Sequence, residues 1–252
     1  MTGAGLAGAF LILTGFLTCS FTPSAAQDRV TTTYFSADSL LITPDEYMVS
    51  DTLPSLVLLH EQGSSRGEFT DIAERFLKMN FNCLVPDIRN GGNNNVTGNE
   101  TARRCRQLGF SRHVDAVEED IRASINHAHE KSGQQVVLLG SGENGALALK
   151  IAAETEAVRA VIALSPGEFF QPHFRVQDTI AGMEKKILVL SSKMEFPYME
   201  QLTSGISEQF KTLFAPVDSP GERGTDALRP TQPSHSEYWL NILLFFKDLQ
   251  EW

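Results

Sequence analysis

The chain has 252 residues, with 21 Lys and Arg against 31 Asp and Glu, and therefore a formal net charge of −10. A chain this acidic repels the phosphate backbone, so a nucleic acid is not expected as a partner. No charged residue precedes Asp28, so all of this charge belongs to residues 27–252. That length fits one large α/β domain.

The uncharged N-terminus has the pattern of a targeting segment. Its apolar run, roughly residues 6–17, is too short to span a bilayer comfortably. Ser24 and Ala26 supply small residues at the alternate positions that signal peptidase prefers. We therefore predict that residues 1–26 are a signal peptide and that residues 27–252 form one exported domain, periplasmic or secreted, without a transmembrane segment. Cys19, as a lipid-modified first residue, is the alternative.

Short β-rich runs alternate with stretches of helical periodicity through the rest of the chain. Antiparallel edge strands are expected within 31–49, and further strands at 56–59, 81–86, 136–139, 160–164, 187–190 and 213–217. Helices are expected at 69–77, 114–125, 144–153, 199–210 and from Ser234 onward. This order predicts an α/β fold, with a mostly parallel central sheet of about eight strands and helices on both faces.

Only 22 residues separate the expected strands 160–164 and 187–190. A large lid domain therefore has no room at this point, and we expect a site at this edge of the sheet to be shallow or open. Four histidines, at positions 113, 127, 129 and 173, show no spacing typical of a metal site. We expect neither a metal nor a cofactor.

Cys83 and Cys105 are the cysteines of the predicted mature domain. In an oxidising compartment the two thiols could pair. Cys83 lies inside an apolar, strand-like run, a position that favours a plain buried thiol instead. The sequence leaves both arrangements open.

The segment from Val136 to Leu149 combines a strand, a tight turn of small residues and a helix. This is the layout of a nucleophile elbow, Gly-x-Ser-x-Gly, in which small residues allow a strained turn and close packing of the helix. Aligning Gly140 with the first glycine puts Gly142 at the nucleophile and Asn144 at the second glycine. Ser141 cannot substitute, because the residue before the nucleophile points elsewhere. An ordinary glycine-rich turn is the alternative on these residues alone.

Four further segments extend this similarity: residues 58–68, 82–92, 99–102 and 164–170. With the elbow, they resemble the dienelactone-hydrolase-like branch of the α/β-hydrolase superfamily, as found in exported bacterial proteins. The resemblance implies an α/β-hydrolase fold over roughly Tyr34 to Leu249. It also implies an oxyanion loop around His60 and Glu61, and a catalytic triad of nucleophile, acid and histidine.

Two of the three triad positions depart from that pattern. Relatives carry serine where Gly142 stands, and histidine where the loop Gly221-Glu222-Arg223-Gly224 has Arg223. The acid position falls on Glu195. Glycine cannot attack a substrate, and arginine stays protonated at any usable pH. The resemblance therefore implies a degenerate triad, and losing nucleophile and base together costs on the order of 10⁶ in rate.

The first functional hypothesis is a non-catalytic binding protein for a small anion, a carboxylate in particular, or for a partner. The backbone amide of Glu143 and the helix N-terminus beside it would attract the anion. His60 and Glu61 would also line this binding site. Arg223 would add a positive charge whose guanidinium can bind both oxygens of a carboxylate. Alternatively, Arg223 pairs with Glu195 and closes the site.

The second hypothesis is an active hydrolase of small esters or lactones. It would use an unrecognised nucleophile, or a water molecule activated by Glu195 or Glu143. His235, near the start of the last helix, and His60 are the histidines to weigh as a replacement base. A purely structural or surface-interaction role is the third hypothesis.

The signal-peptide hypothesis predicts that the mature protein begins at Gln27. Intact-mass analysis of protein isolated from its native host should give the mass of residues 27–252. A species that retains earlier residues, or one that carries a diacylglycerol on Cys19, would contradict the predicted cleavage.

Overall fold

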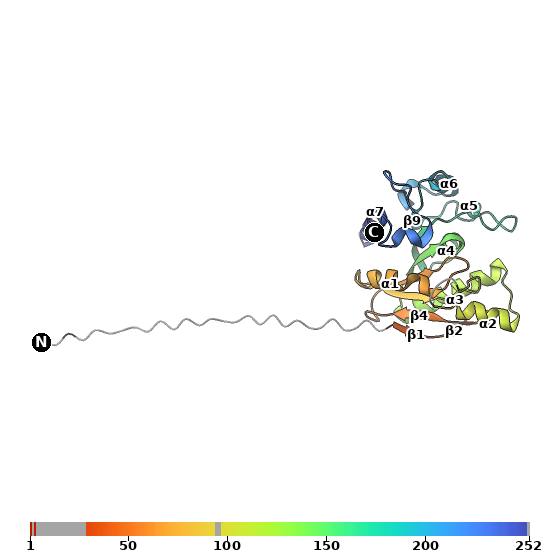
Figure 1. Ribbon diagram of the computed structural model, residues 1–252, viewed down its shortest axis with the longest axis horizontal. Coiled ribbons are helices and arrows are strands. Elements are labelled where there is room, and N and C mark those ends of the chain that lie inside the picture. Colours follow the sequence, from red (N-terminus) through yellow and green to blue (C-terminus); the bar gives the residue numbers. More distant parts are fainter. Residues whose placement is uncertain (2, 4–28, 94–96, 251–252) are drawn as a thin grey trace.

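The computed structural model of the protein describes residues 1, 3, 29–93 and 97–250 (Figure 1). Apart from two positions, the predicted signal peptide with Cys19 lies outside these residues, so its cleavage stays a prediction. Within the described part of the chain, no helix is both long enough and apolar enough to cross a membrane.

An eight-stranded sheet forms the centre of the fold, in the order β1-β4-β6-β5-β7-β8-β9-β10. The strands from β5 to β10 are parallel, and β4 and β1 add an antiparallel edge. The strands are β1 (Arg29–Thr31), β4 (Pro44–Tyr47), β5 (Ser55–Leu59), β6 (Asn82–Pro86), β7 (Val136–Ser141), β8 (Val158–Leu164), β9 (Lys186–Leu190) and β10 (Lys211–Phe214). A separate hairpin pairs β2 (Tyr34–Phe35) with β3 (Leu41–Ile42). The predicted sheet of about eight mostly parallel strands is confirmed.

Helices cover both faces of this sheet, because alternate strand residues point to opposite sides. One face buries Val57 and Leu59 against α3 (Val114–Ser132), α4 (Gly142–Glu154) and α6 (Phe196–Leu202). The other face buries Leu56 and Leu58 against α1 (Thr70–Leu77) and α7 (His235–Gln250). Short 3-10 helices complete the fold: η1 (Arg66–Phe69), η2 (Glu208–Phe210) and η3 (Gly224–Leu228).

Several elements differ from the sequence prediction. The helix predicted at 199–210 ends at Leu202 as α6, and only the short η2 follows it before β10. α2 (Glu100–Leu108) was not expected, because most of its side chains are polar; Asn99 caps it by accepting a 2.7 Å hydrogen bond from the amide of Ala102. β10 ends at Phe214, before the predicted Val217. Pro216 explains the earlier end, since proline has no amide hydrogen to donate to a neighbouring strand.

The cysteines lie in different apolar clusters. Cys83 belongs to the core on the α1 and α7 face, whereas Cys105 packs on α2 against the β2–β3 hairpin. Both are free, buried thiols in this structure. Burial raises the pKa of both thiols above the ordinary value, which suppresses their reactivity as thiolates.

The register of the parallel strands brings their carboxyl ends to one edge of the sheet. Leu164 at the end of β8 pairs with Ser141 on β7 and with Leu190 on β9. The loops that follow β5, β7, β8, β9 and β10 therefore leave from the same edge. Between β8 and β9 the only helix is the four-residue α5 (Val176–Thr179), so the predicted absence of a large lid is confirmed.

The turn between β7 and α4 depends on close backbone contact between Gly140 and Gly145. A Cβ added at Gly145 would lie 2.6 Å from the carbonyl oxygen of Gly140, and one added at Gly140 would lie 2.8 Å from the carbonyl oxygen of Asn144. Both contacts are with backbone, which cannot move aside as a side chain can. The helix can approach the strand this closely only because both positions are glycine.

We predict that Gly145→Ala lowers the free energy of unfolding by about 1–3 kcal/mol, the usual cost of overpacking a rigid contact. Gly98→Ala is the matched control, because the one atom of the described residues within 4 Å of an added Cβ there is a side-chain oxygen, Oδ1 of Asn93, at 3.6 Å. Urea denaturation of both variants measures the difference. Equal stability of the two variants would contradict the close packing of β7 against α4.

Candidate functional site

Gly142 lies at the turn from β7 into α4, at the sheet edge where the five loops meet. Its φ of +56° is in the left-handed region that L side chains rarely adopt. A Cβ added here would lie 2.7 Å from Oε1 of Glu61. The carboxylate of Glu61 therefore borders the space that a nucleophilic side chain would take, and no attacking group is present at this position.

Arg223 joins Glu61 to Glu195. Its Nε donates a hydrogen bond of 3.1 Å to Oε1 of Glu195, and its Nη2 lies 3.5 Å from Oε1 of Glu61. The structure thus has the ion pair that the sequence analysis treated as the alternative to an open site, and Glu61 joins it as a second carboxylate. We call these three residues the Glu61–Arg223–Glu195 cluster. Arg223 has 55% of its side chain exposed, so the cluster is reached from solvent.

Glu195 is fixed firmly in its turn between β9 and α6. Its Oε2 accepts hydrogen bonds from the hydroxyl of Ser165 (2.8 Å) and from the amide and hydroxyl of Ser192 (3.0 and 2.9 Å). Ser165 in turn accepts a 3.0 Å hydrogen bond from the amide of Gly224, next to Arg223. The sequence predicted no role for Ser165 or Ser192. Ser165 comes directly after β8 and Ser192 two residues after β9, and this position at the strand ends was the signal that could have identified them.

Glu68 holds the loop of Glu61 against the loop of Arg223. One of its carboxylate oxygens accepts a hydrogen bond from the amide of Glu61 (3.1 Å), and the other accepts one from the hydroxyl of Thr225 (2.7 Å). Glu68 is buried. This link connects the segments that follow β5 and β10, which are far apart in sequence, and it positions the two halves of the cluster.

His60 lies beneath the site and does not face it. The ring is fully buried; its Nδ1 lies 2.8 Å from the carbonyl oxygen of Glu61, and its Nε2 accepts a 2.9 Å hydrogen bond from the amide of Ile88. With Nε2 an acceptor, Nδ1 carries the proton and donates it to the carbonyl, so the ring is neutral. His60 therefore supports the backbone of Glu61, and neither ring nitrogen is available to a substrate. His235 begins α7, where its Nδ1 contacts the carbonyl oxygen of Gln232 (2.8 Å).

Asn144 ties the elbow to its neighbouring loops. This fully buried residue donates from Nδ2 to the backbone carbonyl oxygen of His60 (2.6 Å), and its Oδ1 accepts from the side-chain Nδ2 of Asn90 (2.8 Å). A polar side chain at the second-glycine position is thus satisfied by hydrogen bonds. Ser141, just before Gly142, is also fully buried, and its hydroxyl has no hydrogen-bond partner among the described residues.

Acidic side chains dominate the electrostatics of the site. Burial raises the pKa of Glu61 above its ordinary value; Arg223 lowers it, and Glu68 opposes Arg223. Burial, followed by the negative charge of Glu61, raises the pKa of Glu143 as well. Arg223 is the cation that stabilises the ionised form of both carboxyls. In the described residues, no group of three or more His, Cys, Asp and Glu side chains could hold a metal ion.

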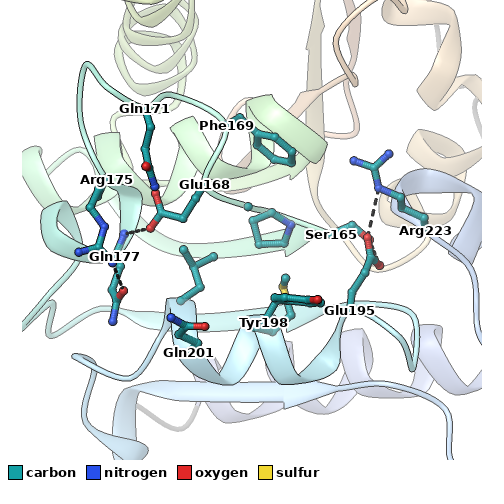
Figure 2. A pocket seen from close by; sticks show the side chains of 14 residues that line it. Ser165, Glu168, Phe169, Gln171, Arg175, Gln177, Glu195, Tyr198, Gln201 and Arg223 are labelled. Atoms are coloured by element: carbon teal, nitrogen blue, oxygen red, sulfur yellow. Dashed lines mark hydrogen bonds and ion pairs between the residues drawn. The ribbon is translucent and has the colours of Figure 1, made fainter.

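An open pocket of about 350 Å³ begins at Arg223 and Glu195 (Figure 2). The two charged side chains lie at one end, and Gln171, Arg175 and Gln177 lie at the other. The wall between them is mainly apolar and consists of Pro166, Phe169, Tyr198, Met199 and Leu202. The sequence predicted an open site here, but it did not predict these wall residues.

Known proteins share this architecture. A sequence model of the dienelactone hydrolase family matches residues 38–217. The fold is similar to an esterase of Pyrococcus furiosus (TM-score 0.66, 14% identity, covering 88% of this chain and 91% of the esterase). It is equally similar to a dienelactone hydrolase of Anabaena variabilis (TM-score 0.66, 14% identity, covering 88% of this chain and 98% of that enzyme).

No curated protein sequence gives a significant match. At 14% identity, the structural similarities establish the fold alone, whereas the family match extends over more than half of the chain. The chain has an α/β-hydrolase fold and belongs to the dienelactone hydrolase family.

Proposed function

We propose that this protein is an exported, non-catalytic binding member of the dienelactone hydrolase family. Its ligand would be a small carboxylate with an apolar body. One observation carries the proposal: at the nucleophile position stands Gly142, and the carboxylate of Glu61 borders the vacant side-chain space, paired with Arg223.

The requirements of covalent acyl transfer support the proposed absence of catalysis. That mechanism needs a hydroxyl or thiol to attack, and a base with a pKa near neutrality to remove its proton. Gly142 offers no attacking atom. Arg223 offers no lone pair, because its guanidinium stays protonated. Restoring the ancestral chemistry would require both side chains to change.

The pocket gives the ligand its proposed chemistry. Nε of Arg223 bonds to Glu195 and Nη2 faces Glu61, whereas Nη1 has no partner among the described residues. A carboxylate that enters from the pocket could accept hydrogen bonds from this guanidinium. The body of the ligand would lie between Phe169 and Tyr198, whose aromatic rings provide apolar contact area.

Glu61 would compete with such a ligand for Arg223. Because its pKa is raised, Glu61 takes up a proton at a higher pH than an ordinary glutamate does. A neutral Glu61 attracts the guanidinium far less and no longer repels an anion. Carboxylate binding should therefore strengthen as the pH falls towards the raised pKa, and weaken above it.

Hydrolysis is the second candidate function, and the position of Glu61 is the observation that favours it. A half-buried carboxylate with a raised pKa, next to the elbow, has the character of a general base for water. Glu195 is less suited, because Ser165, Ser192 and Arg223 already occupy its oxygens. Glu143 is the other candidate from the sequence, also with a raised pKa.

The first prediction of the binding hypothesis concerns covalent chemistry. The wild-type protein should remain unlabelled by a fluorophosphonate probe, because position 142 carries no nucleophile. The variant Gly142→Ser with Arg223→His should gain weak labelling at best, since the new side chain meets Glu61 at 2.7 Å. Stoichiometric labelling of a wild-type serine would contradict the hypothesis. Ester turnover that Glu61→Gln abolishes, without any labelling, would favour water activation instead.

The second prediction concerns ligand binding. Benzoate should raise the melting temperature of the wild type in a saturable, salt-sensitive way, and more at about pH 5 than at about pH 8. Benzamide, which has the same ring without the charge, should have little effect. Arg223→Ala should lose the response to benzoate.

Arg175→Ala is the matched control, because it removes the same charge at the opposite end of the pocket. It should keep most of the response to benzoate. If the wild type fails to respond to benzoate at either pH, while Arg223→Ala melts at a lower temperature, the cluster is purely structural and the carboxylate site is refuted.

A further inference from the structure

The last helix of the fold, α7, is apolar on two sides. Its inner side buries Trp239, Ile242 and Phe246 in the core beneath the sheet. On its outer side, Leu240, Leu243 and Leu244 remain 54%, 46% and 55% exposed. Single exposed leucines are ordinary, but these three are neighbours on one helix face: Leu243 and Leu244 both lie one turn after Leu240, so the three form a continuous stripe. We call these three residues the leucine stripe.

Charged residues frame the leucine stripe in a regular way. Glu237 lies one turn before Leu240, and Lys247 lies one turn after Leu244; both are exposed. The spacing of three, four and three residues along these four positions keeps them on one face of the helix. Such a pattern, apolar in the middle with opposite charges at the two ends, is typical of a seam between two helices.

We propose that this face of α7 binds the same face of a second copy of the chain, with the two helices antiparallel. A two-fold axis near Ile242 places Leu240 opposite the partner's Leu244, and Glu237 opposite the partner's Lys247. Both pairings then occur twice, as two-fold symmetry requires. A parallel arrangement would instead bring like charges together at both ends.

Charge favours a second copy over a lipid surface as the occupant. Interfacial helices carry Lys and Arg on the polar face beside their apolar stripe. α7 has a single lysine, Lys247, with Glu237 on the same face, and the whole chain carries a net charge of −10. One helix seam is smaller than the roughly 800 Å² per partner of a standard interface. Association should therefore depend on concentration.

The proposed interface leaves the pocket side chains untouched. The inner side of α7 supports the site through Tyr238, whose hydroxyl donates to the carbonyl oxygen of Ser191 (3.0 Å) and accepts from the amide of Glu222 (3.1 Å). The leucine stripe lies on the opposite side of the helix. Substitutions in the stripe therefore test self-association without touching the Glu61–Arg223–Glu195 cluster.

Sedimentation velocity of the protein as its host produces it, over a range of concentrations, tests the proposal. We expect a reversible monomer–dimer equilibrium. Leu244→Glu should raise the dissociation constant of the dimer by at least about tenfold. Leu108→Glu, which changes an exposed leucine on α2 outside the stripe, is the control and should still dimerise. Circular dichroism melting checks that both variants are folded.

A charge swap distinguishes the antiparallel pairing from any other contact. Glu237→Lys and Lys247→Glu should each weaken the dimer, and the double variant should restore it. A wild type that stays monomeric at the highest soluble concentration would refute the proposal, and so would a dimer that Leu244→Glu leaves unchanged. A double variant that does not regain the wild-type dimer would also refute it. So would a monomeric wild type that floats with phosphatidylcholine vesicles.

Discussion

The arginine at position 223 is held between two carboxylates, and the character of the site depends on this contact. Glu195 fixes one side of the guanidinium at 3.1 Å, and Glu61 lies 3.5 Å from the other. In a serine hydrolase, a neutral histidine base faces the nucleophile. Arg223 is instead a permanent cation. It stabilises Glu61 as an anion beside Gly142, and it gives the adjoining pocket a charged end.

The residues around the site hold its turn and its loops in place through local contacts. Gly142 adopts the left-handed turn, Glu195 accepts hydrogen bonds from two serines, and Glu68 joins the loops that follow β5 and β10. These contacts contribute to the stability of the fold. Under the binding proposal, the absence of a nucleophile and a base changes the chemistry of the site and leaves these contacts intact.

The parallel strands and the elbow could be predicted from the sequence, because buried apolar runs and small turn residues are local signals. The alignment that placed Gly142, Glu195 and Arg223 came from resemblance, and the structure brings the three positions to one edge of the sheet. The contact of Glu61 with Arg223 could not be predicted, since it joins loops about 160 residues apart through the orientation of two flexible side chains. Helix α2 was missed for a different reason: its capping by Asn99 is local, but its polar composition masks the few residues it buries.

Titration of the Glu61 carboxyl by NMR, in the wild type and in Arg223→Gln, tests the central claim most directly. Burial predicts that the pKa of Glu61 lies above its ordinary value in the wild type. The contact with the guanidinium predicts that this pKa rises further in the variant, because the opposing cation is gone. An ordinary pKa that does not change on loss of Arg223 would show that the two side chains do not meet, and would contradict the account.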